Sequence, residues 1–318
     1  MVFDVFNGDA DGLCALLQLR LTEDREATLV TGVKRDIRLL DRVDAAADDA
    51  LTVLDVSLDS NRAGLARALQ AGAQVTWFDH HYAGEIPVHP RLRAFIDTAP
   101  QVCTSLLVDR HLDGAQRVWA VVAAFGDNLE ETGRRLAGTD FDAAQIEALR
   151  ALGEALNYNA YGDSEADLRL RPAALYAILK AHRSPFAFIA DSPTYAELRD
   201  GYREDMEYAE DVRPVLAEDW GSVHLLPDTA WARRVSGAFA NRVATAHPHQ
   251  AGAVLTCRPG GGFVVSVRAP LARPTGADAL CRQFEGGGGR KSAAGINHLP
   301  VADYERFLSA FRMAEWGT

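Results

Sequence analysis

The sequence has little of the cysteine that disulfide frameworks and zinc ribbons require. It has four cysteines in 318 residues, and no two of them form a Cys-x-x-Cys pair. Such widely spaced thiols argue against both kinds of structure and suit a reducing compartment. We interpret all four as buried thiols without a metal or redox role, namely Cys14, Cys103, Cys257 and Cys281.

Long apolar runs are also absent. No stretch approaches the roughly 20 apolar residues that a helix needs to cross a bilayer, so we expect no membrane partner. The N-terminal segment lacks the basic start and the apolar core of a signal peptide. We therefore expect the protein to be cytoplasmic.

Basic residues are outnumbered by acidic ones. The chain carries 33 Lys and Arg against 44 Asp and Glu, a formal net charge of −11. A long duplex nucleic acid normally needs a broad basic surface, so we expect none as a partner. A small anionic substrate is compatible with this charge, because a few clustered cations or metal ions can dominate one cleft.

The order of the expected elements predicts an α/β protein with two domains. In the first half, strand-like apolar runs at 2–6, 27–31, 51–55 and 75–78 alternate with segments of helical period. This rhythm is typical of a parallel sheet with helices on both faces. We expect this domain to cover residues 1–190. A helical linker at 191–220 would join it to a smaller mixed-sheet α/β domain at 221–318.

Three of these strands end in groups that can bind a metal. The groups are Asp9 and Asp11 after the first strand, Asp55 at the end of the third, and Asp79-His80-His81 after the fourth. In open parallel sheets, ligands bind beyond the carboxyl ends of the strands. Clustered carboxylates repel one another unless a cation neutralises them or their pKa values rise. Oxygen and imidazole ligands without a thiolate favour Mn²⁺ or Mg²⁺ over structural Zn²⁺.

The order of these motifs resembles that of the DHH phosphoesterase superfamily with a C-terminal DHHA1 domain. The matching segments are Asp9-Ala10-Asp11-Gly12, Asp55, Asp79-His80-His81, Phe125-Gly126-Asp127-Asn128 and the glycine-rich stretch 286–295. The resemblance spans nearly the whole chain in the family's order. It implies hydrolysis of a phosphoester by water that two ions, Mn²⁺ or Mg²⁺, activate.

The resemblance also implies a role for each site residue. His81 and Asp79 would be the catalytic residues, with His81 assisting departure of the leaving oxygen as a general acid or by hydrogen bonding. Asp55 would bridge the two ions. The metal ligands would be Asp9 and Asp55 for one ion, and Asp11, Asp55, His80 and Asp127 for the other.

The sequence departs from the family pattern at two positions. Many members carry a histidine four residues before the first motif aspartate, where this chain has Val5. The site around Asp9 then loses a ligand unless Asn7 replaces it. The DHHA1 signature of the nucleases commonly reads Gly-Gly-Gly-His, whereas Arg290 takes the histidine's place here, a form closer to that of alanyl-tRNA synthetase.

The glycine run and the cations after it predict a substrate-binding surface. Glycines let backbone N–H groups approach a phosphate as an anion nest, and arginine, lysine and serine add donors. The resemblance further implies that Arg268 binds the non-scissile end of the substrate. The predicted substrate-binding residues are Arg268, Gly287, Gly288, Gly289, Arg290, Lys291 and Ser292. The segment Lys34-Arg35-Asp36 either reaches the same cleft or begins a solvated helix.

Together these features predict a divalent-metal-dependent phosphoesterase. Its substrate and partner would be a small anionic nucleotide or short oligonucleotide, such as a short RNA (oligoribonuclease activity), pAp, or a cyclic or linear dinucleotide. Two alternatives stay open: a polyphosphate or pyrophosphate hydrolase, and a non-catalytic nucleotide sensor that Val5 and Arg290 would suit. A homodimer is compatible with the sequence, which does not itself indicate one.

Overall fold

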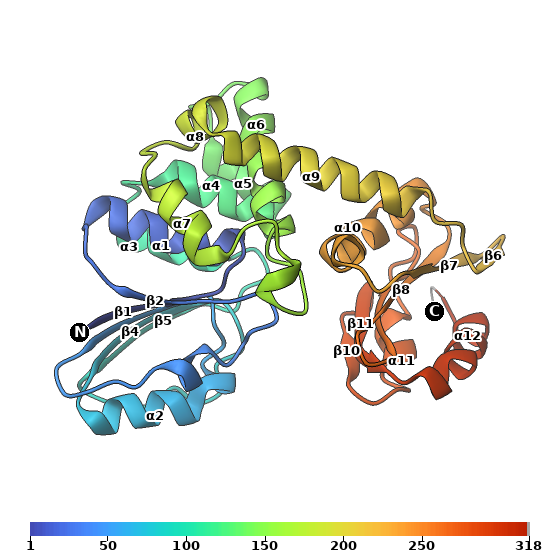
Figure 1. Cartoon of the computed structure of the whole chain (residues 1–318), viewed down its shortest axis with the longest axis horizontal. Coiled ribbons are helices and arrows are strands. Elements are labelled where there is room, and N and C mark those ends of the chain that lie inside the picture. Colours follow the sequence, from blue (N-terminus) through green and yellow to red (C-terminus); the bar gives the residue numbers. More distant parts are fainter. Residues whose placement is uncertain (317–318) are drawn as a thin grey trace. The chain divides into compact units, whose positions relative to one another are not determined.

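The computed structural model describes residues 1–316 and divides the chain into two α/β units (Figure 1). Unit 1 is Met1–Gly201 and unit 2 is Tyr202–Thr318. The boundary lies within α9 (Pro193–Glu210), where the helical linker was predicted. Each unit has its own sheet, one parallel and one mixed, which confirms the predicted fold class.

Unit 1 contains five parallel strands in the order β2-β1-β3-β4-β5. They are β1 (Val2–Phe6), β2 (Thr28–Val30), β3 (Ala50–Leu54), β4 (Gln74–Asp79) and β5 (Leu92–Ile96). The first four match the predicted strands, while β5 is a half-buried edge strand that was not predicted. The chain pairs β1 with β2 on one side and with β3 on the other. The switch point, where open sheets bind ligands, therefore lies between the carboxyl ends of β1 and β3.

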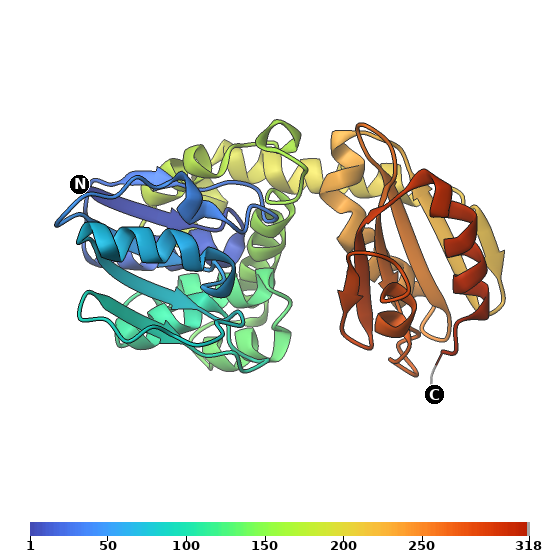
Figure 2. The same ribbon diagram turned by 90° about the horizontal axis from the view of Figure 1, so that it is seen from below.

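Helices cover both faces of this sheet, because successive side chains of a strand point to opposite sides. In β1, Val5 belongs to a core shared with α2 (Arg62–Ala71), whereas Phe6 belongs to the core shared with α1 (Ala10–Thr22). Figure 2 shows α2 lying across its face of the sheet. The helices cover the faces of the sheet, so the polar loops beyond the strand ends can form a site.

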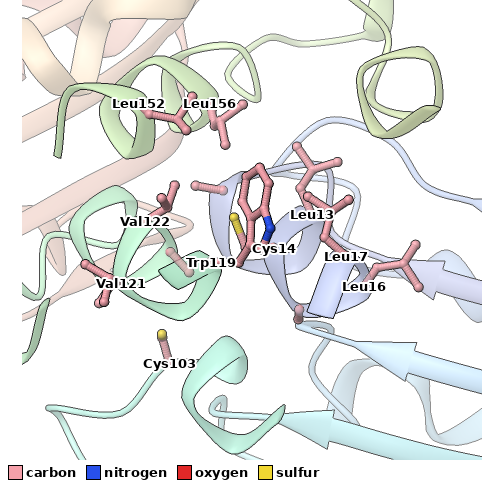
Figure 3. Packing of buried hydrophobic residues seen from close by; sticks show 14 of the residues in the cluster. Leu13, Cys14, Leu16, Leu17, Cys103, Trp119, Val121, Val122, Leu152 and Leu156 are labelled. Carbon is pink, nitrogen blue, oxygen red and sulfur yellow. The ribbon is translucent and has the colours of Figure 1, made fainter. Parts of the chain in front are cut away.

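The face with α1 carries a thick helical layer. Its core is centred on Trp119, which lies between side chains of α1 and α6 (Figure 3). This packing fixes α1 and α3, whose N-terminal ends carry site residues. The layer consists of α1 with α3 (Thr104–His111), α4 (Arg117–Gly126), α5 (Glu130–Ala137), α6 (Ala143–Tyr158), α7 (Pro172–Lys180) and α8 (Pro185–Asp191).

Unit 2 contains a six-stranded sheet in the order β10-β11-β9-β8-β7-β6, in which only β7 and β8 pair in parallel. The strands are β6 (Leu216–Glu218), β7 (Gly221–Leu226), β8 (Ala251–Cys257), β9 (Phe263–Arg268), β10 (Gly287–Gly289) and β11 (Ala293–Leu299). On one face, α11 (Ala277–Cys281) and α12 (Tyr304–Met313) share a core with the sheet. On the other face, Phe239 of α10 (Ala230–Ala246) packs against His224 of β7.

No helix within residues 1–316 is both long and apolar enough to cross a bilayer. The cytoplasmic location stays a prediction.

Candidate metal centre

Asp9 is placed at the switch point by the start of α1. It is the N-cap of this helix, and its Oδ1 accepts hydrogen bonds from the backbone N–H of Asp11 at 3.0 Å and of Gly12 at 3.1 Å. A Cβ at position 12 would lie 2.1 Å from the carbonyl oxygen of Asn7, so the tight turn after β1 requires glycine there. Asp9 is thereby held buried, with Oδ2 facing the site.

Asp55 follows β3 in the left-handed backbone region, at φ 58°. This conformation is uncommon for a residue with a Cβ, and such strain gathers at functional sites. The backbone N–H of Asp55 donates to Phe78, and its Oδ1 accepts a 3.1 Å hydrogen bond from the hydroxyl of Thr104. The buried carboxylate is thus fixed between the ends of β3 and β4.

Asp11 is bound by the N-terminal end of α3. Its two carboxylate oxygens accept hydrogen bonds from the backbone N–H groups of Thr104 and Ser105, each at 2.7 Å. The hydroxyl of Ser105 donates to the carbonyl oxygen of Asp11 at 2.9 Å. A helix N-terminus favours negative charge, so α3 orients this carboxylate. The sequence does not single out Thr104 and Ser105, because they bind the Asp11 carboxylate through backbone N–H groups, which any residue type would supply.

His80 brings an imidazole nitrogen to these carboxylates. Its Nδ1 lies 2.9 Å from the carbonyl oxygen of Val102, which can only accept, so Nδ1 carries a hydrogen and Nε2 is available as a ligand. Nε2 lies 3.5 Å from Asp55 Oδ1, 3.8 Å from Asp127 Oδ2 and 4.0 Å from Asp11 Oδ2. The structure therefore brings together all the residues predicted to bind the second ion.

His81 lies beside this cluster with its ring directed by Asp79. Its Nδ1 is 2.7 Å from Oδ1 of the fully buried Asp79, so Nε2 is the ring nitrogen available to a substrate. Asp79 Oδ1 also accepts the backbone N–H of His80 at 2.9 Å, and no described residue hydrogen-bonds to its buried Oδ2. These contacts place Asp79 behind His81.

The electrostatics of the cluster call for a cation. Burial, with the charges of Asp9 and Asp11, raises the pKa of Asp55 well above its usual range, and burial raises that of Asp127 to about 6. Burial opposes protonation of His80, but its contact with Asp55 and the charges of Asp11 and Asp127 raise the pKa of the imidazole to about 10. Each shift shows that the site disfavours further negative charge and favours a bound positive one.

The donor set fits a divalent ion of the Mn²⁺ or Mg²⁺ type. Ligand atoms of Asp11, His80 and Asp127 lie within 4.8 Å of one another, as do those of Asp55, His80 and His81. Oxygen ligands with one imidazole, and no thiolate, are the preference of such ions. Neither triplet includes Asp9.

Asp9 is instead paired with Lys34, in the loop after β2. Nζ of Lys34 lies 2.5 Å from Asp9 Oδ2, donates to Asn157 Oδ1 at 3.2 Å and is 3.8 Å from Asp127 Oδ1. Burial raises the pKa of Asp9, yet the adjacent ammonium outweighs it and brings the pKa below its usual value. Burial opposes the charge of Lys34, but Asp9, Tyr161 and Asp127 raise its pKa well above the usual range. Lys34 therefore lies at the metal centre of unit 1, beside Asp9 and Asp127.

Val5, one of the two positions that depart from the family pattern, and Asn7, its possible replacement as a ligand, both precede Asp9 in the chain. Val5 is fully buried in the core shared with α2. The side-chain oxygen of Asn7 accepts the backbone N–H of Asp9 at 3.2 Å, and its nitrogen donates to the backbone of Lys34 at 3.3 Å. Asn7 thus fixes the backbone around Asp9 rather than offering an additional ligand.

The predicted substrate-binding residues of unit 2 meet at one end of its sheet. Arg268 ends β9, and the backbone N–H of Ala269 donates to the carbonyl oxygen of Ser292 at 2.9 Å, which places the exposed turn Arg290-Lys291-Ser292 beside it. The guanidinium of Arg268 donates to Asn241 Oδ1 at 2.6 Å. The glycines form the edge strand β10 rather than the predicted nest.

Comparisons by sequence and by structure give different results. No family model matches the chain, and no curated protein matches it by sequence. Solved structures match over 98% of the chain. Exonuclease RecJ bound to manganese has 16% identity, a TM-score of 0.62 and 89% of its own length covered. The pGpG-specific phosphodiesterase PggH from Vibrio cholerae has 16% identity, a TM-score of 0.62 and 98% of its length covered.

A RecJ structure from Thermus thermophilus with Mn²⁺ also matches, at 17% identity and a TM-score of 0.59, with 51% of its length covered. The chain therefore has the fold of DHH phosphoesterases with a DHHA1 domain. This confirms the predicted resemblance at the level of the fold.

Proposed function

We propose that this protein is a divalent-metal-dependent phosphoesterase acting on short nucleotide substrates. The observation that carries the proposal is the convergence of Asp11, Asp55 and Asp127 on Nε2 of His80, at the switch point of a parallel sheet. A bound divalent ion would lower the pKa of a water molecule and neutralise charge on the phosphoryl group. The shared fold with RecJ exonuclease and the pGpG phosphodiesterase supports hydrolysis of a nucleotide phosphoester.

We propose that His81 protonates the leaving oxygen. Asp79 accepts a hydrogen bond from Nδ1 and fixes the orientation of the ring, so that a protonated ring can donate Nε2–H to the leaving oxygen. The exposed fraction of the His81 side chain, 47%, lets a phosphate reach it, whereas the fully buried Asp79 does not meet the substrate. Asp79 would then be a positioning residue.

We propose that the turn Arg290-Lys291-Ser292, with Arg268, binds the non-scissile end of the substrate. The exposed cations and the adjacent hydroxyl provide charge-assisted donors for a second phosphate or a ribose. The acidic balance of the chain, a formal net charge of −11, supports a short substrate over a long duplex.

The test is a substrate screen with the metal-free chain, supplied with Mn²⁺ or Mg²⁺. The substrates are pGpG, cyclic dinucleotides, pAp, short RNAs, polyphosphate and an aryl phosphodiester. We expect metal-dependent release of nucleotide products, abolished by a chelator. Hydrolysis of polyphosphate alone would support that rival activity instead, and binding without turnover of any substrate would support a nucleotide sensor.

A further inference from the structure

The two halves of the metal centre differ in the ligands that they offer. Nε2 of His80 has oxygens of Asp11, Asp55 and Asp127 within 4.0 Å. The half around Asp9 has only Asp55 as a further predicted ligand, because position 5 is a buried valine. The centre therefore offers four ligands to an ion at His80 and fewer ligands to a second ion at Asp9.

The half around Asp9 already contains a positive charge. Nζ of Lys34 lies 2.5 Å from Asp9 Oδ2, and Asn157 Oδ1 accepts a second hydrogen bond at 3.2 Å. The ammonium group thus joins three segments that are far apart in the sequence, those containing Lys34, Asp9 and Asn157. The Lys34 side chain is 28% exposed, so it has one open side.

This arrangement neutralises Asp9 without a metal. A divalent ion bound to the same carboxylate would meet the ammonium at close range, and like charges at a partly buried site repel strongly. An ammonium has three N–H donors, of which Asp9 and Asn157 take two, while Asp127 Oδ1, at 3.8 Å, lies beyond hydrogen-bond distance. The remaining donor can face a phosphoryl oxygen, which an ion at this position would otherwise contact.

We propose that the ammonium group of Lys34 replaces one of the two ions, so that the centre binds a single divalent cation per chain. The proposal rests on the proposed function and revises the expected number of ions. Asp11, Asp55, His80 and Asp127 bind the cation, while Asp9 holds Lys34. Asp55 is then a ligand of one ion rather than a bridge.

Metal stoichiometry tests the proposal independently of turnover. The full chain, stripped with a chelator, is titrated with Mn²⁺ by equilibrium dialysis and followed by electron paramagnetic resonance. We expect one Mn²⁺ per chain and a spectrum without spin coupling between ions. Two coupled ions would overturn the replacement and leave the proposed function intact, whereas no binding at all would overturn the proposed function itself.

Variants at position 34 test whether the lysine is the cause. Lys34→Ala should bind two ions and show coupling, while Lys34→Arg should retain one. Arg35→Ala is the matched control, because Arg35 lies 3.6 Å from Asp163 rather than beside Asp9, and it should also bind one ion. A single ion in Lys34→Ala at saturating Mn²⁺ would mean that Val5 alone removed the site, and would overturn the role of Lys34.

Thermal unfolding monitors the folding of these variants. Metal-free Lys34→Ala should melt at a lower temperature than the wild type, because Asp9 is left buried without a counter-charge. Saturating Mn²⁺ should then raise its melting temperature more than it raises that of the wild type. If Lys34→Ala does not fold, Lys34→Gln keeps a donor for Asp9 without the charge and should bind the second ion.

Discussion

Both the backbone and the side chain of Asp55 are constrained by the structure of the metal centre. Its left-handed backbone, φ 58°, costs of the order of 1 kcal/mol and directs the buried carboxylate between Thr104 and His80. Alanine tolerates this backbone poorly, whereas asparagine adopts it readily. Asparagine is therefore the substitution that changes the charge of Asp55 while preserving its geometry.

We expect Asp55→Asn to keep the fold and to lose metal and activity together. Turnover should fall by more than the roughly 10–100-fold that loss of an outer-shell partner costs, because a direct ligand is weakened. Metal content and rate are measured on the same preparation. The control is Asp59→Asn, an exposed aspartate that pairs with Arg62, which should behave as the wild type. Normal metal content in Asp55→Asn would show that Asp55 is not a ligand.

The contribution of His81 to the rate should depend on how much the leaving oxygen needs a proton. If His81 donates a proton to the departing oxygen, His81→Ala should lower kcat for a nucleotide by about 10²–10⁴-fold and affect an activated aryl phosphodiester far less. His89→Ala is the control, since the ring of His89 accepts the backbone N–H of Arg91 outside the site. An equal loss on both substrates would assign His81 to binding instead of proton transfer.

At the scale of elements, the N-terminal end of α3 organises one half of the centre. Its first N–H groups bind both oxygens of Asp11, and the Thr104 hydroxyl binds Asp55. One helix end thus orients ligands from the loops after β1 and β3, and rigid secondary structure fixes their geometry.

In unit 2, two glycines of the edge strand β10 have different surroundings. A Cβ at Gly287 would lie 1.9 Å from the carbonyl oxygen of Cys281 in α11, whereas a Cβ at Gly288 would meet no described atom within 4 Å. The first glycine therefore allows close packing, and the second leaves the strand open to an approaching ligand.

We expect Gly287→Ala to destabilise unit 2 and Gly288→Ala to leave its stability nearly unchanged. Overpacking at position 287 should cost about 1–3 kcal/mol, measured by chemical unfolding. If substrate approaches β10, Gly288→Ala should raise KM with little change in kcat. Equal stability of the two variants would contradict the packing role of Gly287, and an unchanged KM in Gly288→Ala would place the substrate elsewhere.

At the scale of the whole molecule, the centre links stability to pH. The folded state raises the pKa of Asp127 to about 6 and that of His80 to about 10. Both groups then hold more protons in the folded than in the unfolded chain, over about pH 4–6 for Asp127 and about pH 6.5–10 for His80. Their contribution to stability is present at low pH and is lost as the pH rises.

We therefore expect the melting temperature of the metal-free protein to include a term that falls as pH rises from 5 to 9. With saturating Mn²⁺ the trend at these residues should reverse, because protons compete with the ion for the same ligands. Scanning fluorimetry with and without the metal measures both slopes. Asp127→Asn is the reference variant. If its metal-free melting temperature still falls with pH near pH 6, Asp127 is not the group responsible for that fall.

The strands of unit 1 could be predicted from the sequence more completely than those of unit 2. In unit 1 the alternation of apolar strands and amphipathic helices predicted four of the five strands, because burial on both faces leaves continuous apolar runs. In unit 2, β10 was not foreseen as a strand. Its glycines carry no side-chain pattern, and only pairing with β11 makes them a strand.

The amino-acid sequence by itself determined the cluster of Asp9, Asp11, Asp55 and His80, because parallel strands deliver their carboxyl ends to one edge of a sheet wherever the chain folds as βαβ units. Only the tertiary structure decided what each group meets there. The pairing of Lys34 with Asp9 and the orientation of Asp11 by α3 depend on contacts between loops and helices distant in the chain. No local periodicity encodes such contacts, since they arise when the packed core fixes those segments in space.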